Sequence, residues 1–283
     1  MKDLAYYNGV YTPYDAACVS LSDRSIFFSD AVYDVIVGNG KKTYQLDGHI
    51  DRLLSNAERI GLADLPAKSE LYEIVENLLS DADAEDFMLY IQLSGSNERR
   101  NHARSESEVN LLITVTGCEL PRELTEIKAI TLPDMRHSFC NLKTTSLLPA
   151  ILSVEEAHRR GADIAIFHKN QSVTECSYAN ISILKDGTLI THPLDTDILP
   201  GITQENLVFA CQKMGIPHIS RIFTLDELYK SDAVMITSTT KLIKVCTEID
   251  RTPLKPKDLD TVKALFNELK EDLYGKISKE FRN

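Results

Sequence analysis

The feature that most constrains the fold is a repeated change between strand patterns and helix patterns, broken once by a proline-containing linker. Three runs rich in β-branched and aromatic residues predict strands at residues 31–37, 87–93 and 109–115. Residues 117–122 are the best candidate linker, because Pro121 interrupts pairing and strand signals restart at Ile127. The pattern predicts an α+β protein with a smaller domain over residues 1–120 and a larger one over residues 121–283.

Apolar side chains at 3.6-residue spacing predict helices between these strands. The first helix begins at Asp47 and ends before Gly61, a residue type common just after helices. Further helices are predicted at residues 69–79, at 147–160, after Gly201, and at 259–277. Further strands are predicted at residues 163–167, 172–175, 180–184 and 233–236. A polar, basic loop at residues 94–107 separates two of the first strands.

Composition excludes several classes of partner. The chain has 283 residues and is 43% hydrophobic, which is enough for a sizeable core. Its net charge of −11 repels nucleic acid and anionic membrane surfaces, and no apolar run of 18 residues is present to span a membrane. The six cysteines are scattered, without metal-ligand spacing. We therefore expect a cytoplasmic protein with reduced thiols, no metal, and neither nucleic acid nor membrane as a partner.

Two residues have the chemistry of covalent catalysis on a carbonyl group. Lys143 lies in a polar segment just before a predicted helix, where a lysine is usually exposed; a lowered pKa would make it a nucleophile. Glu175 ends a predicted strand. It is either a polar strand-end residue or a buried carboxylate that keeps a ring nitrogen protonated. Composition alone does not separate these alternatives.

Other segments could bind anions. Gly201-Ile202-Thr203 at a helix start and Thr237-Ser238-Thr239-Thr240 after a strand both offer backbone N–H groups and hydroxyls, although each is also compatible with an ordinary cap or turn. Arg99-Arg100-Asn101-His102 is a basic cluster that is either a solvated turn or a clamp for a carboxylate. Tyr33 follows Asp30 on a predicted strand, where a tyrosine commonly packs half-buried.

The order of six segments along the chain is more specific than any one of them. They are Asp23-Arg24 with residues 28–34, His49-Ile50-Asp51-Arg52-Leu53, Asn141-Leu142-Lys143, residues 173–180, residues 198–203, and Thr237-Ser238-Thr239-Thr240. In this order they resemble the motifs of the fold-type IV (class IV) aminotransferases, which depend on pyridoxal 5′-phosphate (PLP). The resemblance covers nearly the whole chain. Arg100-Asn101-His102 and the segment after Lys143 are most similar to the D-amino acid transaminase branch.

The resemblance implies a role for each matching residue. Lys143 and Glu175 would be catalytic, with Lys143 carrying PLP and Glu175 binding its pyridine nitrogen. The residues implied in cofactor binding are Arg52, Lys143, Glu175, Leu199, Ile202, Thr203 and Thr239. Those implied in substrate binding are Tyr33, Arg100 and His102. The family implies a homodimer in which the loop with Arg100 and His102 reaches a neighbouring subunit, and it implies amino acids and 2-oxo acids as substrates.

Departures from the family pattern concern the substrate more than the cofactor. Ser29-Asp30-Ala31, Gly95-Ser96, Ser146 and Gln204 stand where Gly-Asp-Gly, Arg-Gly, Asn and Arg are common. The predicted function is transamination between a D-amino acid such as D-alanine and a 2-oxo acid such as 2-oxoglutarate. An aminodeoxychorismate lyase and a branched-chain L-amino-acid aminotransferase remain alternatives on the same scaffold. A non-catalytic binding protein is a third alternative, disfavoured by the Lys143 and Glu175 motifs.

Overall fold

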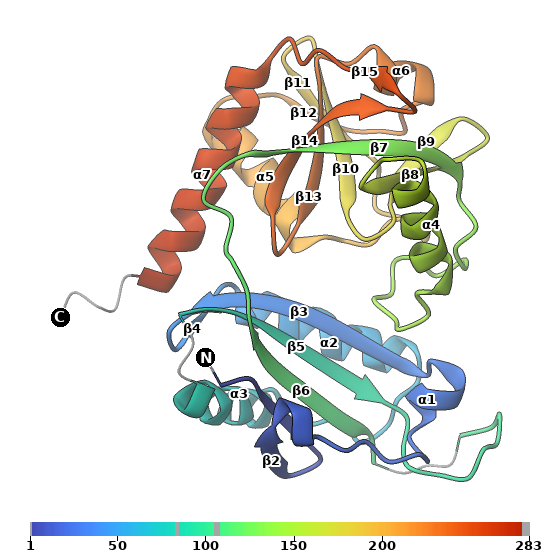
Figure 1. The fold of residues 1–283 in the computed structure, drawn as a ribbon, viewed down its shortest axis with the longest axis vertical. Coiled ribbons are helices and arrows are strands. Elements are labelled where there is room, and N and C mark those ends of the chain that lie inside the picture. The colour runs from blue at the N-terminus through green and yellow to red at the C-terminus, as the bar shows by residue number, and fades with distance from the viewer. Residues whose placement is uncertain (1, 83–84, 105–107, 279–283) are drawn as a thin grey trace. The chain divides into compact units, whose positions relative to one another are not determined.

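The computed structural model describes residues 2–82, 85–104 and 108–278, which group into two compact units (Figure 1). Unit 1 comprises Met1–Leu120, Leu142–Ser146 and Tyr274–Asn283, and unit 2 comprises Pro121–Asn141 and Leu147–Leu273. Residues 142–146 thus group with unit 1, whereas the sequence places them in the second domain, because their backbone pairs with a unit 1 strand. Outside the described residues lie positions 105–107 of the predicted loop and the outer ends of the predicted domains, Met1 and residues 279–283.

Unit 1 is built on a six-stranded antiparallel sheet with the order β2-β1-β6-β5-β3-β4. The strands are β1 (Leu4–Tyr7), β2 (Val10–Pro13), β3 (Ala31–Asn39), β4 (Lys42–Thr43), β5 (Asp86–Ser94) and β6 (Asn110–Gly117). Asn8 and Gly9 connect β1 to β2 with positive φ angles of 46° and 89°, as a tight hairpin turn requires. The long pair β3–β5 aligns Ala31 with Ser94, so the residues just before β3 lie next to those just after β5.

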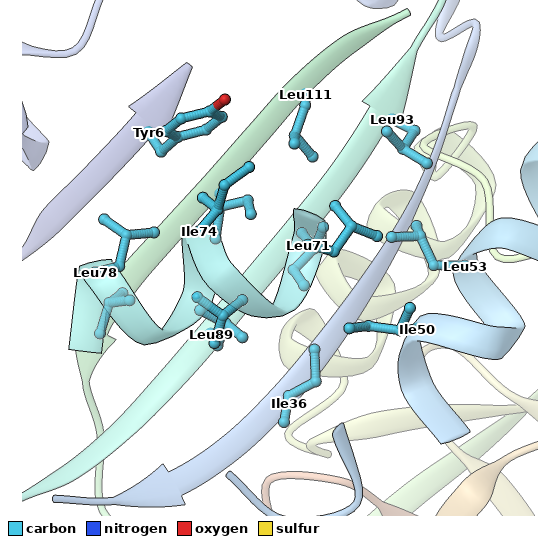
Figure 2. Close-up of a cluster of buried hydrophobic side chains, with 14 of the residues drawn as sticks. Tyr6, Ile36, Ile50, Leu53, Leu71, Ile74, Leu78, Leu89, Leu93 and Leu111 are labelled. Atoms are coloured by element: carbon cyan, nitrogen blue, oxygen red, sulfur yellow. The ribbon is translucent and has the colours of Figure 1, made fainter. Parts of the chain in front are cut away.

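Two helices cover one face of this sheet, α2 (Leu46–Arg59) and α3 (Lys68–Ala82). Figure 2 shows their apolar side chains, among them Ile50, Leu53 and Leu71, facing Leu89 and Ile36 of the sheet. These side chains are fully or almost fully buried, and each contributes about 1.5–3 kcal/mol by leaving water. Both helices are confirmed predictions, since their apolar residues recur at the spacing that places them on one face.

Two short helices precede β3, the 3-10 helix η1 (Tyr14–Ala16) and α1 (Arg24–Phe28). Asp23 caps α1 by accepting a hydrogen bond from the Ser25 N–H at 2.8 Å, and Ser29 ends it in the left-handed region with φ 51°. The sequence pattern does not predict α1, because five residues are too few to show helical periodicity. The helix positions Arg24 and Phe28, which the site below uses.

Unit 2 contains a nine-stranded mixed sheet with the order β12-β11-β10-β13-β14-β7-β8-β9, and β15 pairs with β14. The strands are β7 (Thr125–Pro133), β8 (Ile164–Lys169), β9 (Ser172–Cys176), β10 (Asn180–Lys185), β11 (Thr188–Thr191), β12 (His218–Ser220), β13 (Ala233–Ser238), β14 (Leu242–Ile249) and β15 (Thr252–Pro253). The parallel pair β7–β8 is joined through a helix, as parallel strands require. The pattern did not reveal β14, where a bulge between Cys246 and Glu248 breaks the alternation.

The helices of unit 2 are α4 (Leu148–Arg159), α5 (Ile202–Lys213), α6 (Leu225–Tyr229) and α7 (Leu259–Ser278), the last of which ends among residues grouped with unit 1. Pro149 lies in the first turn of α4, where a missing N–H costs nothing. The sequence predicts α4, α5 and α7 within a few residues, and it misses α6. Throughout residues 2–82, 85–104 and 108–278, no helix combines the length and apolar character that crossing a membrane would need.

Candidate active site

Lys143 lies on a short extended segment that pairs with β3 in unit 1. The Tyr33 N–H donates to the Lys143 carbonyl at 2.9 Å, and the Thr145 N–H donates to the Ala31 carbonyl at 3.1 Å. Lys143 Nζ lies 4.5 Å from the centroid of the Tyr33 ring. That ring stacks on Tyr90 with the two centroids 5.3 Å apart. The structure therefore brings Lys143 and Tyr33 together, with the lysine backbone anchored to the sheet.

Arg52 is held by a buried carboxylate. Its Nε and Nη2 donate to the two oxygens of Asp34, each at 2.8 Å, and His49 Nδ1 lies 2.7 Å from Asp34 Oδ1. Burial alone would raise the pKa of Asp34, but hydrogen bonds from His49 and Arg52 and their charges outweigh it and lower the pKa well below its usual range. Asp34 thus stays ionised and orients the guanidinium of Arg52. The sequence analysis did not single out Asp34. An acidic residue within an otherwise apolar strand could have indicated it, because a buried carboxylate needs a partner.

The predicted clamp residues lie around one aromatic ring. The guanidinium carbon of Arg100 is 5.2 Å from the centroid of Phe28, and the His102 ring is 5.3 Å from it. Phe28 belongs to α1, and the loop after β5 carries Arg100 and His102. An arginine guanidinium can bind both oxygens of a carboxylate, and a neighbouring imidazole can contact the same carboxylate.

Glu175 is a buried residue of β9 with several donors directed at it. Its carboxylate accepts hydrogen bonds from Arg136, from Asn180 Nδ2 at 3.0 Å and from the Leu199 N–H at 3.2 Å. Burial raises the pKa of Glu175 to about 7, although the charge and hydrogen bond of Arg136 act to lower it. A second cation beside this carboxylate, such as a protonated ring nitrogen, would favour its ionised form.

Arg136 is a site residue that the sequence reading missed. It also binds Asp134, with Nε donating to Oδ1 at 2.9 Å and Nη2 donating to Oδ2 at 2.6 Å, and it stacks on Phe167 at 4.9 Å. Asp134 and Phe167 thus fix the guanidinium that contacts Glu175. An Asp-x-Arg sequence just after a strand was the only signal available, and it is too common to be specific.

The start of α5 in unit 2 has the features of the anion site expected from the sequence. Gly201 precedes the helix, and a Cβ atom placed on it would lie 1.9 Å from Asn180 Oδ1, so only glycine fits. Thr203 and Gln204 are buried in the first turn, and Gln204 Oε1 is one of the buried atoms without a hydrogen-bond partner among the described residues. The free N–H groups and the dipole of this 12-residue helix favour an anion. Thr239 lies in the turn after β13, whose Thr237 pairs with Asn180 of β10.

These residue types match the chemical groups of PLP. An amine on an anchored backbone suits its aldehyde, and a buried carboxylate with a neighbouring amide suits its ring nitrogen. A glycine cradle at a helix N-terminus suits its phosphate. The fold, and the groups that each unit contributes, are of the kind found in PLP-dependent enzymes.

Comparison with known proteins gives the family. Residues 31–249 match the model of the family described as Amino-transferase class IV, and the chain belongs to this family of PLP-dependent aminotransferases, which act on amino acids and 2-oxo acids. The family and the fold predicted from the sequence are therefore confirmed.

Individual relatives agree with this assignment. The chain is 37% identical over 240 residues to a D-alanine aminotransferase of Listeria monocytogenes serotype 1/2a (strain 10403S), covering 83% of each protein. It is 31% identical over 261 residues to a D-alanine aminotransferase of Staphylococcus epidermidis (strain ATCC 35984), covering 91% of this chain and 93% of the relative. A solved branched-chain aminotransferase from Thermoproteus uzoniensis with norvaline superposes with a TM-score of 0.88 at 25% identity, covering 98% and 96%.

Proposed function

We propose that this protein transfers the amino group of a D-amino acid, such as D-alanine, to a 2-oxo acid, such as 2-oxoglutarate. The observation that carries the proposal is that Arg100 and His102 both lie next to the Phe28 ring, so an arginine and an imidazole are close together and could bind one substrate carboxylate. Similarity to D-alanine aminotransferases over most of their length supports it.

Seven residues would hold the cofactor in this proposal. They are Arg52, Lys143, Glu175, Leu199, Ile202, Thr203 and Thr239. Arg52, Ile202, Thr203 and Thr239 would bind the phosphate, and Leu199 would pack against the ring. Glu175 would pair with the protonated ring nitrogen, whose positive charge adds to that of Arg136 in favouring the ionised carboxylate.

The protein's own groups direct the reaction. When bound, PLP supplies an electron sink for the negative charge that develops at the substrate α-carbon. Lys143 Nζ would remove the proton from that carbon as a general base and, once protonated, donate it again as a general acid, roles worth roughly 10² to 10⁴-fold in rate. Tyr33, Arg100 and His102 orient the carboxylate, and the side of the cofactor on which they act relative to Lys143 decides which enantiomer reacts.

The test uses purified protein with D-alanine, L-alanine or L-leucine, each with and without 2-oxoglutarate, and measures 2-oxo acid formation. We expect product only with D-alanine and acceptor together. Product from L-leucine and none from D-alanine would overturn the proposal in favour of a branched-chain aminotransferase. Pyruvate released from aminodeoxychorismate without an acceptor would overturn it in favour of a lyase.

We also propose that the protein is a homodimer, with the loop carrying Arg100 and His102 serving the partner's site. Exposed apolar side chains support a subunit contact. Leu148, Ile151 and Leu152 recur at spacings of three and four residues on α4, so they form one face, and they are 65%, 54% and 60% exposed. Light scattering on the purified protein tests the dimer, and a mixed-variant experiment described below tests the shared site.

Cytoplasmic location is a further proposal, which reduced thiols support. The six cysteines are free, and four of them are buried. Buried unpaired thiols are typical of proteins that fold in a reducing compartment. Cell fractionation tests the location, and recovery of the protein outside the cytoplasmic fraction would overturn it.

A further inference from the structure

Two separate points of the loop after β5, Gly95 and Arg104, are tied to one residue, Asp30. At the beginning of the loop, the Gly95 N–H donates to the Asp30 carbonyl at 3.0 Å. At residue 104, Arg104 Nε donates to Asp30 Oδ2 at 2.7 Å and its Nη2 donates to Oδ1. The register of β3 and β5, which aligns Ala31 with Ser94, places Asp30 where it can make the first contact.

The middle of the loop is held by Arg24, which is only 4% exposed. Its Nε donates to Asp30 Oδ2 at 2.7 Å, and its Nη1 donates to Glu98 Oε1 at 3.1 Å. Two further bonds reach backbone carbonyls, from Nη1 to Asn101 at 2.6 Å and from Nη2 to His102 at 3.1 Å. One side chain therefore sets the path of the backbone on both sides of Asn101, including at His102 itself.

The same arginine packs on the ring that the clamp residues contact. The Arg24 guanidinium carbon lies 4.7 Å from the Phe28 centroid, and Arg100 and His102 lie around that ring as well. Gly95 allows the close approach, since a Cβ atom there would lie 2.8 Å from Arg24 Cδ and 3.0 Å from Asp30 Oδ2. The packing leaves no space for a larger residue at position 95.

Charge favours this arrangement. Burial alone would raise the pKa of Asp30, but hydrogen bonds from Arg104 and Arg24 and their charges lower it, so the carboxylate is ionised between two cations. The side chains of Arg24 and Asp30 are 5% and 10% exposed, whereas that of Arg104 is 30% exposed. A charge-assisted bond is strong where water is excluded, and Asp30 is the partner that both arginines share.

We propose that Arg24, Asp30 and Arg104, which we name the loop clasp, are positioning residues that hold Arg100 and His102 ready for the substrate carboxylate. The proposal rests on the carboxylate-binding role proposed above for those two residues. The clasp touches neither substrate nor cofactor in this scheme. It acts by keeping the loop in one conformation before substrate arrives, which lowers the ordering cost of binding.

The test compares Arg104→Gln and Arg24→Lys with the wild-type protein. Arg104 is the more exposed partner, so Arg104→Gln is expected to fold. Lys68→Gln is the matched control, because it removes an ion pair with Asp47 and Asp51 elsewhere in unit 1. Two measurements are made on each holoenzyme. The first is hydrogen exchange of residues 95–104, and the second is steady-state kinetics with D-alanine and 2-oxoglutarate.

We expect exchange of this segment to become roughly tenfold faster in Arg104→Gln and in Arg24→Lys. We also expect KM for both substrates to rise roughly tenfold while kcat changes much less, since both substrates carry the carboxylate. The visible absorbance of the bound cofactor should be unchanged in both variants. The control Lys68→Gln should match the wild-type protein in hydrogen exchange and in kinetics. Unchanged exchange, or faster exchange with unchanged KM, would overturn the clasp. A different result would identify a failure of the proposed function: the wild-type protein does not react with D-alanine, yet exchange is still faster in Arg104→Gln. The clasp would then hold the loop but would have no role in binding this substrate.

Discussion

At the scale of single residues, Lys143 combines an anchored backbone with a long side chain. Its carbonyl accepts a hydrogen bond from Tyr33, and its amine lies over the Tyr33 ring. A base that must move a proton between two atoms benefits from a fixed backbone and a long, flexible side chain. Glu175 differs, because its carboxylate is fixed by Arg136, Asn180 and the Leu199 N–H.

Replacing Lys143 should abolish the reaction. Lys143→Ala removes the proposed base and the covalent attachment of the cofactor, so we expect turnover to fall by at least about 10²-fold and the visible absorbance of the protein to change. Lys230→Ala, at an exposed ion pair with Asp226 on α6, is the control and should behave as wild type. Turnover retained in Lys143→Ala would show that another residue is the base.

Gly201 offers a second residue-scale test, directed at the phosphate site. Gly201→Ala places a methyl group against Asn180, which also binds Glu175, so Asn180 must move. We expect the dissociation constant of PLP to rise by roughly tenfold or more, measured by titrating the apoprotein. Gly275→Ala is the control, because nothing lies within 4 Å of its added Cβ atom. Equal affinities in the two variants would contradict the assignment of the anion site.

At the scale of elements, the contact of β3 with α2 is both structural and functional. Asp34 from the middle of β3 binds Arg52 and His49 of α2, in a unit whose remaining helix–sheet contacts are largely apolar. A buried carboxylate with two partners fixes the rotation of the helix against the sheet. The same contact directs Arg52 for its proposed role.

Asp34→Asn should therefore destabilise the protein. We expect the free energy of unfolding to fall by about 3–5 kcal/mol at neutral pH, because the largely buried Arg52 loses its counter-charge. The folded-state pKa of Asp34 is lowered, so its contribution is present above the unfolded pKa of about 4 and is lost as pH falls below it. Urea unfolding at a series of pH values checks both points. Exposed Asp47→Asn is the control, and an equal loss in the two variants would refute the role of burial.

At the scale of the whole molecule, the proposed dimer makes each site depend on two chains. The loop that carries Arg100 and His102 is held within its own unit 1 by the clasp. A loop that is already held in one conformation can contribute residues to the partner subunit's site without first being ordered by that subunit. In this proposal, Lys143 of one chain would transfer the proton, and Arg100 and His102 of the other chain would bind the carboxylate.

Mixing two impaired variants at a substrate concentration where each alone is nearly inactive tests this arrangement. In a dimer of Lys143→Ala with Arg100→Ala, a shared site would combine the intact lysine of one chain with the intact loop of the other. Random assembly would then restore about a quarter of wild-type activity, since half of the dimers carry one complete site of two. Mixed samples no more active than the separate variants would show that the loop serves its own chain. Each variant mixed with itself is the control.

The sequence by itself determined the family and much of the secondary structure. Motif order depends on local residue types, and helices such as α2 and α3 show their apolar spacing within a few turns. Five-residue α1 and bulged β14 escaped this reading, because neither shows a regular period. The residue roles inferred from the motifs stay predictions, to be checked by the variants above.

Only the tertiary structure decided which residues support the site. Arg24 meets Glu98, Asp30 meets Arg104, and Arg136 meets Glu175 across separations of 74, 74 and 39 residues. Such pairs depend on strand register and on how a loop folds back, for example the alignment of Ala31 with Ser94. Each of these residues looks ordinary in the sequence, because its role comes from a partner that local pattern does not identify.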